Sequence, residues 1–394
     1  MANYALSQTS GYFLSNDCKI ADLEALTNLS LDVGDLNFAT DVQKNIPIYD
    51  MNTLRDRLRM PSARRALMAE WAYIFSDSAG VIVLKNAYED TSAIDEASEI
   101  FKQIIAEEKE SSGEGADHFA AAGNNDRIWN SLQKLCEKSP TVFAKYFANP
   151  AIDAACEAWL GPNYQMTAQV NLVRPGGKAQ TCHRDYHLGF QTEEMCARYP
   201  VQVHLLSPLM TLQGGIAHCD MPIESGPTKL LPFSQKYAAG YAAYRRADFQ
   251  QHFEDNYVQL DLNKGDALFF NPALYHAAGE NTSQDIERLV NLMQIGSAMG
   301  RTLENVDRIG MCKLLYPALK EVIASENLSP SEINAAISVC AEGYPFPTNL
   351  DTDPPVGGLA PESQKDIFLK ALSEKWSDVN FIRALDAQAE KQTA

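Results

Sequence analysis

The chain has 394 residues, of which 51 are acidic and 33 basic, and its formal net charge is −18. A field of this sign repels the phosphates of nucleic acids and anionic membrane surfaces, so we expect neither as a partner. The apolar share of 45% is that of an ordinary globular protein, and a chain of this length can bury a large core. No run approaches the roughly 20 apolar residues that a membrane-spanning helix needs.

The eight cysteines are scattered, without a Cys-x-x-Cys pair. This pattern is typical of free thiols in a reducing compartment, and it disfavours a disulfide scaffold or a zinc ribbon. The first residues lack the basic region and apolar run of a secretory signal. We therefore expect a cytoplasmic protein.

Helices are predicted for the first part of the chain, up to about residue 162. A capping box at Ser92 precedes apolar residues that share one helical face, and Gly161-Pro162 ends the last helical pattern. Besides the helix from Ser92, the predicted helices cover residues 61–74, 128–147 and 151–160.

Short strands are predicted for the middle part, about residues 163–300. Apolar and polar residues alternate there over short runs that glycine, proline and asparagine interrupt. The turn residues 263–266 between two of the runs indicate a hairpin. Several short strands in succession favour an antiparallel sandwich or barrel. The runs cover residues 166–173, 202–210, 257–262, 267–270 and 288–295.

The last part, about residues 301–394, has a helical pattern again. Ser329 and Glu332 form a capping box around a proline at the first helical position. Residues 344–361 contain five prolines and indicate an extended, ordered loop or lid, and residues 364–388 a terminal helix. We predict one domain over residues 1–394, mainly a β core that helices at both ends of the chain cover.

Two histidines and an aspartate form a candidate metal centre. If residues 181–186 are a strand, His183 and Asp185 project from the same face, and barrel closure can bring His276 beside them. Two imidazoles and one carboxylate can hold ferrous iron and leave its other face open for chemistry. Structural zinc sites usually fill all four positions with Cys or His, so the mixed set fits a working metal better. A chance His-x-Asp triplet is the alternative.

Arg288 is the candidate anion-binding residue, because it follows His276 at the start of the next strand-like run. An inward guanidinium can hold a carboxylate through two parallel hydrogen bonds. Taken alone, an arginine at a strand end is usually a solvated charge. Near the metal motif, His187, Tyr186 and Phe190 are candidate pocket residues, whereas the remaining histidines are expected to be core or surface residues.

Four motifs in the expected order resemble the phytanoyl-CoA dioxygenase family. Residues 264–283 and Arg288 resemble its distal motif, which runs Gly-Asp, an apolar strand, His, Gly, Asn-x-Ser and Arg. Residues 224–236 resemble its Asn-Gly-Pro…Pro-Gly-Ser-His-Lys segment, and residues 180–188 its metal-binding strand. Three upstream segments, residues 80–84, 149–150 and 160–162, also occur in the order that the family shows. The resemblance covers about residues 65–297.

The resemblance implies a double-stranded β-helix core, a jelly roll of the cupin type, and a dioxygenase that uses Fe(II), 2-oxoglutarate and O2. Such an enzyme oxidises a C–H bond of a small organic substrate and releases succinate and CO2. The retained Asp185 favours hydroxylation, because halogenating relatives lack the carboxylate ligand. By position, the residues carried over are the iron ligands His183, Asp185 and His276, and Arg288 for the distal carboxylate of 2-oxoglutarate. Face alternation adds Gln169 and Asn171 as co-substrate contacts.

The chain departs from the family pattern at three positions. Ala278 stands where many relatives have Ser or Thr, Phe233 where glycine is usual, and Gln235 where histidine is common. Two other classes stay open: a cupin-like metalloenzyme that does not use 2-oxoglutarate, and a non-catalytic binding or sensor protein on the same fold. The net charge disfavours a CoA thioester, and we expect a secondary metabolite, amino acid or lipid-like molecule as substrate.

Overall fold

The computed structural model describes residues 11–112 and 125–393. The helices before the main core are α1 (Ile20–Thr27), α2 (Met51–Leu58), α3 (Pro61–Asp77), α4 (Ser92–Ser112), α5 (Ser131–Lys138), α6 (Pro140–Phe147) and α7 (Pro150–Leu160). The helices within the core region are α8 (Glu193–Cys196), α9 (Val201–Leu206), α10 (Gly240–Ala243) and α11 (Ala247–Asn256). The C-terminal helices are α12 (Arg308–Glu326), α13 (Pro330–Cys340), α14 (Gln364–Ser373) and α15 (Asp378–Gln392).

Two sheets form the core, which is the double-stranded β-helix that the family resemblance implies. The larger sheet has the strand order β1-β2-β3-β8-β6-β10-β5-β4, and β7 pairs with β9 in the smaller sheet. All pairs are antiparallel except β2 with β3. The strands are β1 (Asp41–Gln43), β2 (Ile46–Asp50), β3 (Val81–Lys85), β4 (Asn125–Ile128), β5 (Gln165–Val173), β6 (Thr211–Ala217), β7 (Lys229–Leu231), β8 (Ala267–Phe270), β9 (Tyr275–Ala277) and β10 (Arg288–Gly296).

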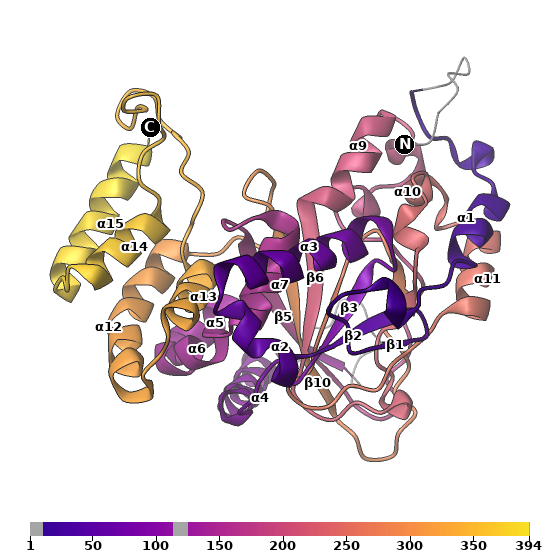
Figure 1. Cartoon of the computed structure of the whole chain (residues 1–394), viewed down its shortest axis with the longest axis horizontal. Coiled ribbons are helices and arrows are strands. Elements are labelled where there is room, and N and C mark those ends of the chain that lie inside the picture. The colour runs from indigo at the N-terminus through magenta and orange to yellow at the C-terminus, as the bar shows by residue number, and fades with distance from the viewer. Residues whose placement is uncertain (1–10, 113–124, 394) are drawn as a thin grey trace.

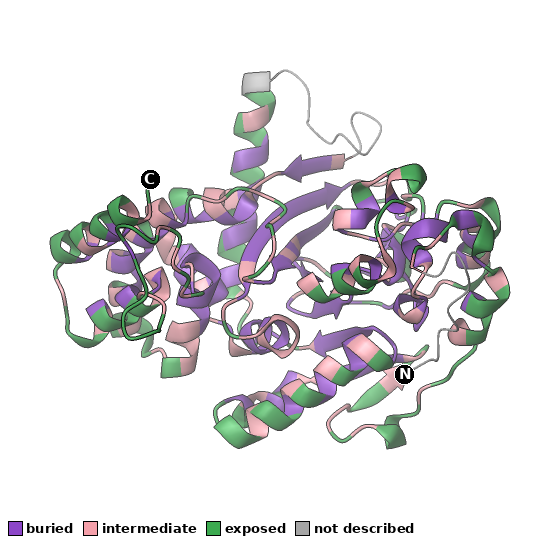
Figure 2. Ribbon diagram, turned by 90° about the horizontal axis from the view of Figure 1, so that it is seen from above, coloured by how far each residue is buried: buried purple, intermediate pink, exposed green. Residues whose placement is uncertain are grey.

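Helices flank the larger sheet, and each end of the molecule carries its own group. The C-terminal helices α12 to α15 lie together at one end, while α1, α10 and α11 lie at the other (Figure 1). Helices α12 and α13 pack on α6. Figure 2 shows that the strands of the core are mostly buried, whereas exposed residues lie on the outer faces of the helices and in the loops.

One continuous apolar cluster runs from the N-terminal helices through the sheet to the C-terminal helices. It includes Trp71 of α3, Phe269 of β8, Leu315 of α12 and Phe368 of α14, each of which is fully buried. Burial of apolar surface contributes roughly 25 cal/mol per Å², so this shared core couples the terminal helices to the sheet. The organisation as a single domain stays a prediction, and the continuity of this core supports it.

Several predicted helices are confirmed because local signals fix their ends. Proline occupies the first turn of α3, and a capping box closes around Ser329 at α13. The prediction of one helix over residues 128–147 is wrong. Asn130 adopts a left-handed conformation after β4, and the residue before Pro140 is extended, as residues before proline prefer. The result is two short helices. The terminal helix also divides, at Lys375, whose φ is 56°.

Three of the predicted strands are wrong. Residues 202–210 form α9 and a 3-10 turn, and the strand begins only at Thr211. Residues 257–262 and 181–186 contribute isolated bridges instead of strands. The turn at 263–266 is present, but the runs on its two sides pair with different partners, so it is not a hairpin. Residues 344–361 form an extended loop, as predicted.

All eight cysteines are free thiols, as their spacing predicts. Cys312 and Cys340 lie near each other between α12 and α13, with their sulfur atoms 3.7 Å apart. Among the described residues, no helix combines the length and apolarity needed to cross a membrane.

Candidate iron centre and pocket

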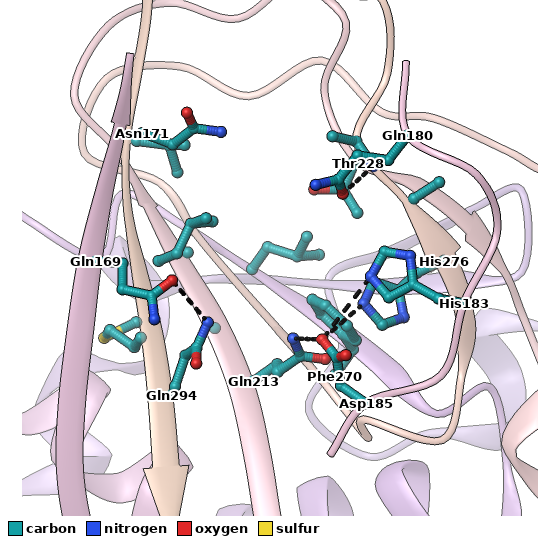
Figure 3. Close-up of a pocket in the computed structure, with 18 of the residues that line it drawn as sticks. Gln169, Asn171, Gln180, His183, Asp185, Gln213, Thr228, Phe270, His276 and Gln294 are labelled. Carbon is teal, nitrogen blue, oxygen red and sulfur yellow. Dashed lines mark hydrogen bonds and ion pairs between the residues drawn. The ribbon is translucent and has the colours of Figure 1, made fainter. Parts of the chain in front are cut away.

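The structure brings the three predicted metal ligands together. His183 and Asp185 lie in the loop after β5, and His276 lies in β9. One ligand atom of each lies within 4.8 Å of those of the other two. The Nε2 atoms of His183 and His276 are 3.8 Å and 3.6 Å from Oδ2 of Asp185, and both rings face the carboxylate (Figure 3). This donor set fits the two-histidine, one-carboxylate triad that holds ferrous iron.

Backbone carbonyl groups hold both rings in the orientation that a metal requires. The Nδ1 atom of His183 lies 2.9 Å from the carbonyl oxygen of Thr181, and that of His276 lies 2.8 Å from the carbonyl oxygen of Leu274. A carbonyl oxygen can only accept, so each Nδ1 carries the proton and each Nε2 keeps its lone pair for a metal. Two backbone hydrogen bonds between His183 and His276 fix the distance between the rings.

Asp185 is held by a side chain that the sequence analysis did not identify. Nε2 of Gln213, on β6, donates to Oδ2 of Asp185 at 2.8 Å. Burial raises the pKa of Asp185, but the neighbouring imidazoles and the Gln213 hydrogen bond outweigh this effect and lower the pKa below its usual value. Burial and the nearby His276 lower the pKa of His183. Both shifts favour the protonation states that bind metal.

Arg288 stands at the start of β10 with its side chain buried. Nη1 donates to the carbonyl oxygens of Ser225 and Gly279, at 3.1 Å and 3.3 Å. Within the described part of the chain, no acidic side chain forms an ion pair with it. Burial lowers the pKa of Arg288 to about 10, which still leaves it charged at neutral pH. A buried guanidinium of this kind is suited to a small carboxylate ligand.

A cavity of about 690 Å³ contains the triad and Arg288. Gln169, Asn171 and Gln294 also line it, so the two co-substrate contacts expected from face alternation lie inside the cavity. The carbonyl oxygen Oε1 of Gln169 accepts from Arg127 Nη1 at 3.1 Å and from Gln294 Nε2 at 3.3 Å. Asn171 is one pleat nearer to Arg288, because it pairs with Val290 across the ladder.

Two of the three pocket candidates near the metal motif line the cavity. Tyr186 and Phe190 do so, and 56% of the Phe190 surface is exposed. His187 is not among the lining residues. Most of the other histidines have structural partners: His204, His218 and His252 form hydrogen bonds outside the site. His118 lies outside the described residues.

Comparison with known protein families places the chain in one of them. The model of the phytanoyl-CoA dioxygenase family matches residues 76–289, more than half of the chain. The chain therefore belongs to the phytanoyl-CoA dioxygenase family. The match covers the triad and Arg288, so the motifs on which the resemblance rested lie within it.

Named relatives are distant. The dioxygenase andF of Emericella variicolor is 25% identical over 154 residues, which cover 38% of this chain and 48% of that protein. The dioxygenase trt7 of Aspergillus terreus is 24% identical over 213 residues, which cover 53% of this chain and 67% of that protein. The chain thus spans about half to two thirds of the length of these curated relatives.

Solved structures are similar at lower identity. The crystal structure of SnoN, described as a non-heme alpha ketoglutarate dependent epimerase from nogalamycin biosynthesis, is 18% identical with a TM-score of 0.42, covering 59% of this chain and 84% of that chain. That of the carbocyclase SnoK from the same biosynthesis is 18% identical with a TM-score of 0.39, covering 58% of this chain and 83% of that chain.

Proposed function

We propose that the protein is an Fe(II)- and 2-oxoglutarate-dependent dioxygenase that oxidises a C–H bond of a small organic substrate and releases succinate and CO2. The observation that carries the proposal is the shared cavity, in which a three-residue metal triad lies with a buried arginine that has no acidic partner among the described residues. Membership of the phytanoyl-CoA dioxygenase family supports it.

His183, Asp185 and His276 hold the iron in this proposal. When bound, the metal supplies the activation of O2 and 2-oxoglutarate on which C–H oxidation depends. The protein contributes a rigid ligand set, because carbonyl groups orient both imidazoles and Gln213 orients the carboxylate. The carbonyl partners raise the basicity of the two imidazoles, and partners that orient metal ligands commonly matter for metal affinity.

Arg288 holds the distal carboxylate of 2-oxoglutarate, and Asn171 assists from the neighbouring strand. Its side chain lines the cavity, and its amide Nδ2 is the atom that can donate to a carboxylate, which only accepts. Gln169 has a different environment, because its carbonyl oxygen already accepts two hydrogen bonds. We therefore assign Gln169 the role of positioning Gln294.

The remaining walls of the cavity are suited to substrate binding and to the exclusion of water. Leu262, Leu268, Phe270 and Leu292 contribute apolar surface to the wall of the cavity. An apolar enclosure protects a reactive centre from water and strengthens the electrostatic interactions inside it. Phe190, which is more than half exposed, lies where the cavity meets solvent.

Oxygen-dependent turnover of 2-oxoglutarate tests the proposed function. We expect purified protein with Fe(II) to convert 2-oxoglutarate into equal amounts of succinate and CO2, slowly without substrate and faster when a substrate is added. His183→Ala should abolish the release, and Arg288→Gln should raise the KM for 2-oxoglutarate. A protein that binds iron but releases no succinate with any of the substrates screened would favour the cupin-like alternative. In that alternative the activity does not depend on Arg288.

A further inference from the structure

Three glutamines line the cavity on the inward face of the larger sheet. Gln169 lies on β5, Gln294 on β10 and Gln213 on β6, and β10 is the strand between the other two. Gln294 pairs directly with Gln213, while Gln169 is one pleat further along, opposite Leu292. We call these three residues the glutamine row. Figure 3 shows the row along the floor of the cavity, with its Gln213 end beside Asp185.

The two ends of the row fix which amide atoms face the cavity. At one end an arginine, which can only donate, donates from Nη1 to Oε1 of Gln169, and the same oxygen accepts from Nε2 of Gln294. The free atom of Gln294 is therefore its carbonyl oxygen. At the other end, the carboxylate of Asp185 can only accept, and it accepts from Nε2 of Gln213. The free atom of Gln213 is again its carbonyl oxygen.

Both free oxygens are buried and lack a hydrogen-bond partner within the described residues. The hydroxyl of Tyr186, which approaches Gln213 in the same cavity, is also buried without a partner among the described residues, and it can donate or accept. Buried acceptors without a partner cost stability, and native structures rarely retain them without a reason. The two glutamine oxygens are acceptors, so a ligand group that satisfies them must donate hydrogen bonds.

We propose that the glutamine row is a substrate subsite that recognises a group that donates hydrogen bonds, a hydroxyl or an N–H, on an otherwise apolar molecule. The proposal rests on the proposed function, because it places the substrate in the cavity of that enzyme. A carbonyl, carboxylate or phosphate group has only acceptor oxygens at neutral pH. Such a group could not form a hydrogen bond with Oε1 of Gln213 or of Gln294, and both glutamine oxygens would stay unpaired. Leu268 and Phe270 also line the cavity and provide apolar surface for the rest of such a substrate.

The position of the row also predicts where the substrate reacts. Gln213 bonds directly to the iron ligand Asp185, so a donor group held by Gln213 and Gln294 lies next to the metal centre. The carbon atoms close to that donor group are then the ones presented for oxidation. Orientation of this kind is a main contribution of a protein to catalysis.

A matched set of bicyclic probes tests the proposal. The set is 2-decalol, decahydro-2-naphthylamine, 2-decalone, 2-methoxydecalin and decalin-2-carboxylate, which share one apolar skeleton and differ in the polar group. Dissociation constants are measured by ligand-detected NMR with the full chain, both metal-free and with Fe(II) and 2-oxoglutarate in the absence of oxygen. We expect the alcohol or the amine to bind about 3- to 10-fold tighter than the ketone and the ether. The amine binds as its ammonium ion at neutral pH, so its comparison with the alcohol reports N–H donation together with positive charge.

Two variants separate recognition from general packing. Gln294→Met removes an acceptor with little change in side-chain volume, and it should reduce the preference for the donor probes at least threefold. Gln165→Met is the matched control. It removes a glutamine at the start of β5 that donates to the carbonyl oxygens of Ser297 and Gly300 and is not among the residues that line the cavity. The control should keep the preference even if its thermal stability falls.

Each outcome bears on the proposal separately from the enzyme's identity. Equal or tighter binding of the ketone, ether or carboxylate would overturn it, as would the absence of binding by any probe. A preference that survives in Gln294→Met would do the same. If the donor preference is present but the protein fails to bind 2-oxoglutarate with Fe(II), the proposed function is contradicted and the subsite remains.

Discussion

Substitution of Arg288 tests how the co-substrate is held. The guanidinium is buried, with 4% of the residue exposed, and it donates to two backbone carbonyl groups. Among the described residues no carboxylate pairs with it, so under the proposed function the distal carboxylate of 2-oxoglutarate balances its charge. Lysine at this position keeps a charge but loses the planar fork, and glutamine loses the charge as well.

The size of the effect follows from the buried environment. Removal of one partner of a buried, hydrogen-bonded charge pair costs about 2–5 kcal/mol. Because each 1.4 kcal/mol corresponds to about a tenfold change in affinity, Arg288→Gln should raise the Kd for 2-oxoglutarate about 30-fold or more. For Arg288→Lys we expect about tenfold, since a charge-assisted contact contributes about 1.5–3 kcal/mol and lysine retains part of it.

Calorimetric titration of 2-oxoglutarate into the Fe(II)-loaded protein without oxygen measures these constants. Arg308→Lys provides the control, because Arg308 is also buried and donates to backbone carbonyl groups of Met166, Val339 and Cys340, away from the cavity. The control should lower the Tm and leave the Kd unchanged. An Arg288→Gln protein that binds 2-oxoglutarate within threefold of the wild type would refute the reasoning.

Three further predictions concern the surroundings of the site and the core. Gln213→Leu removes the hydrogen bond to the carboxylate ligand and should weaken Fe(II) binding about 10- to 100-fold in a chelator competition; unchanged affinity would show that this contact is irrelevant. His218 is buried between two hydroxyl groups, and burial lowers its pKa to about 3, whereas the unfolded value is about 6.5. Between about pH 3 and pH 6.5 the unfolded state therefore binds more protons than the folded state. The stability that comes from neutral His218 is complete above about pH 6.5 and is lost as the pH falls towards 3. The loss is at most about 1.4 kcal/mol per pH unit. Denaturation at pH 7 and pH 5 should show a smaller loss in His218→Gln, and an equal loss would contradict this origin. Gly189→Ala would place Cβ against the carbonyl oxygen of Arg184 and should lower the Tm, whereas Gly34→Ala, with nothing within 4 Å, should not; similar melting of both would rule out the clash.

The candidate site could be located from the sequence because its residues lie in local motifs. His183 and Asp185 are two residues apart, and His276 and Arg288 follow a short apolar strand. The structure brings the three ligands together even though residues 181–186 are not a strand. The isolated bridge between His183 and His276 supplies the alignment that a regular ladder would have supplied.

Gln213 cannot be found in this way, because the sequence pattern places the strand over residues 202–210 and not over the residues that form it. Residues 202–210 alternate like a strand, but Pro200 precedes a helical turn there, and the strand that carries Gln213 begins later, at Thr211. The smaller sheet was also difficult to predict. Its strands β7 and β9 have three residues each, too few for a period of two to be recognised, and their pairing depends on partners distant in the sequence.

The visible spectrum of the protein under anaerobic conditions tests the central claim most directly. Fe(II) and then 2-oxoglutarate are added to the metal-free protein, and we expect a weak metal-to-ligand charge-transfer band that requires both additions. The band should be absent in His183→Ala and should need a higher concentration of 2-oxoglutarate in Arg288→Gln. No band in the wild type, with iron shown to be bound in stoichiometric amount, would contradict the assignment of 2-oxoglutarate to this cavity.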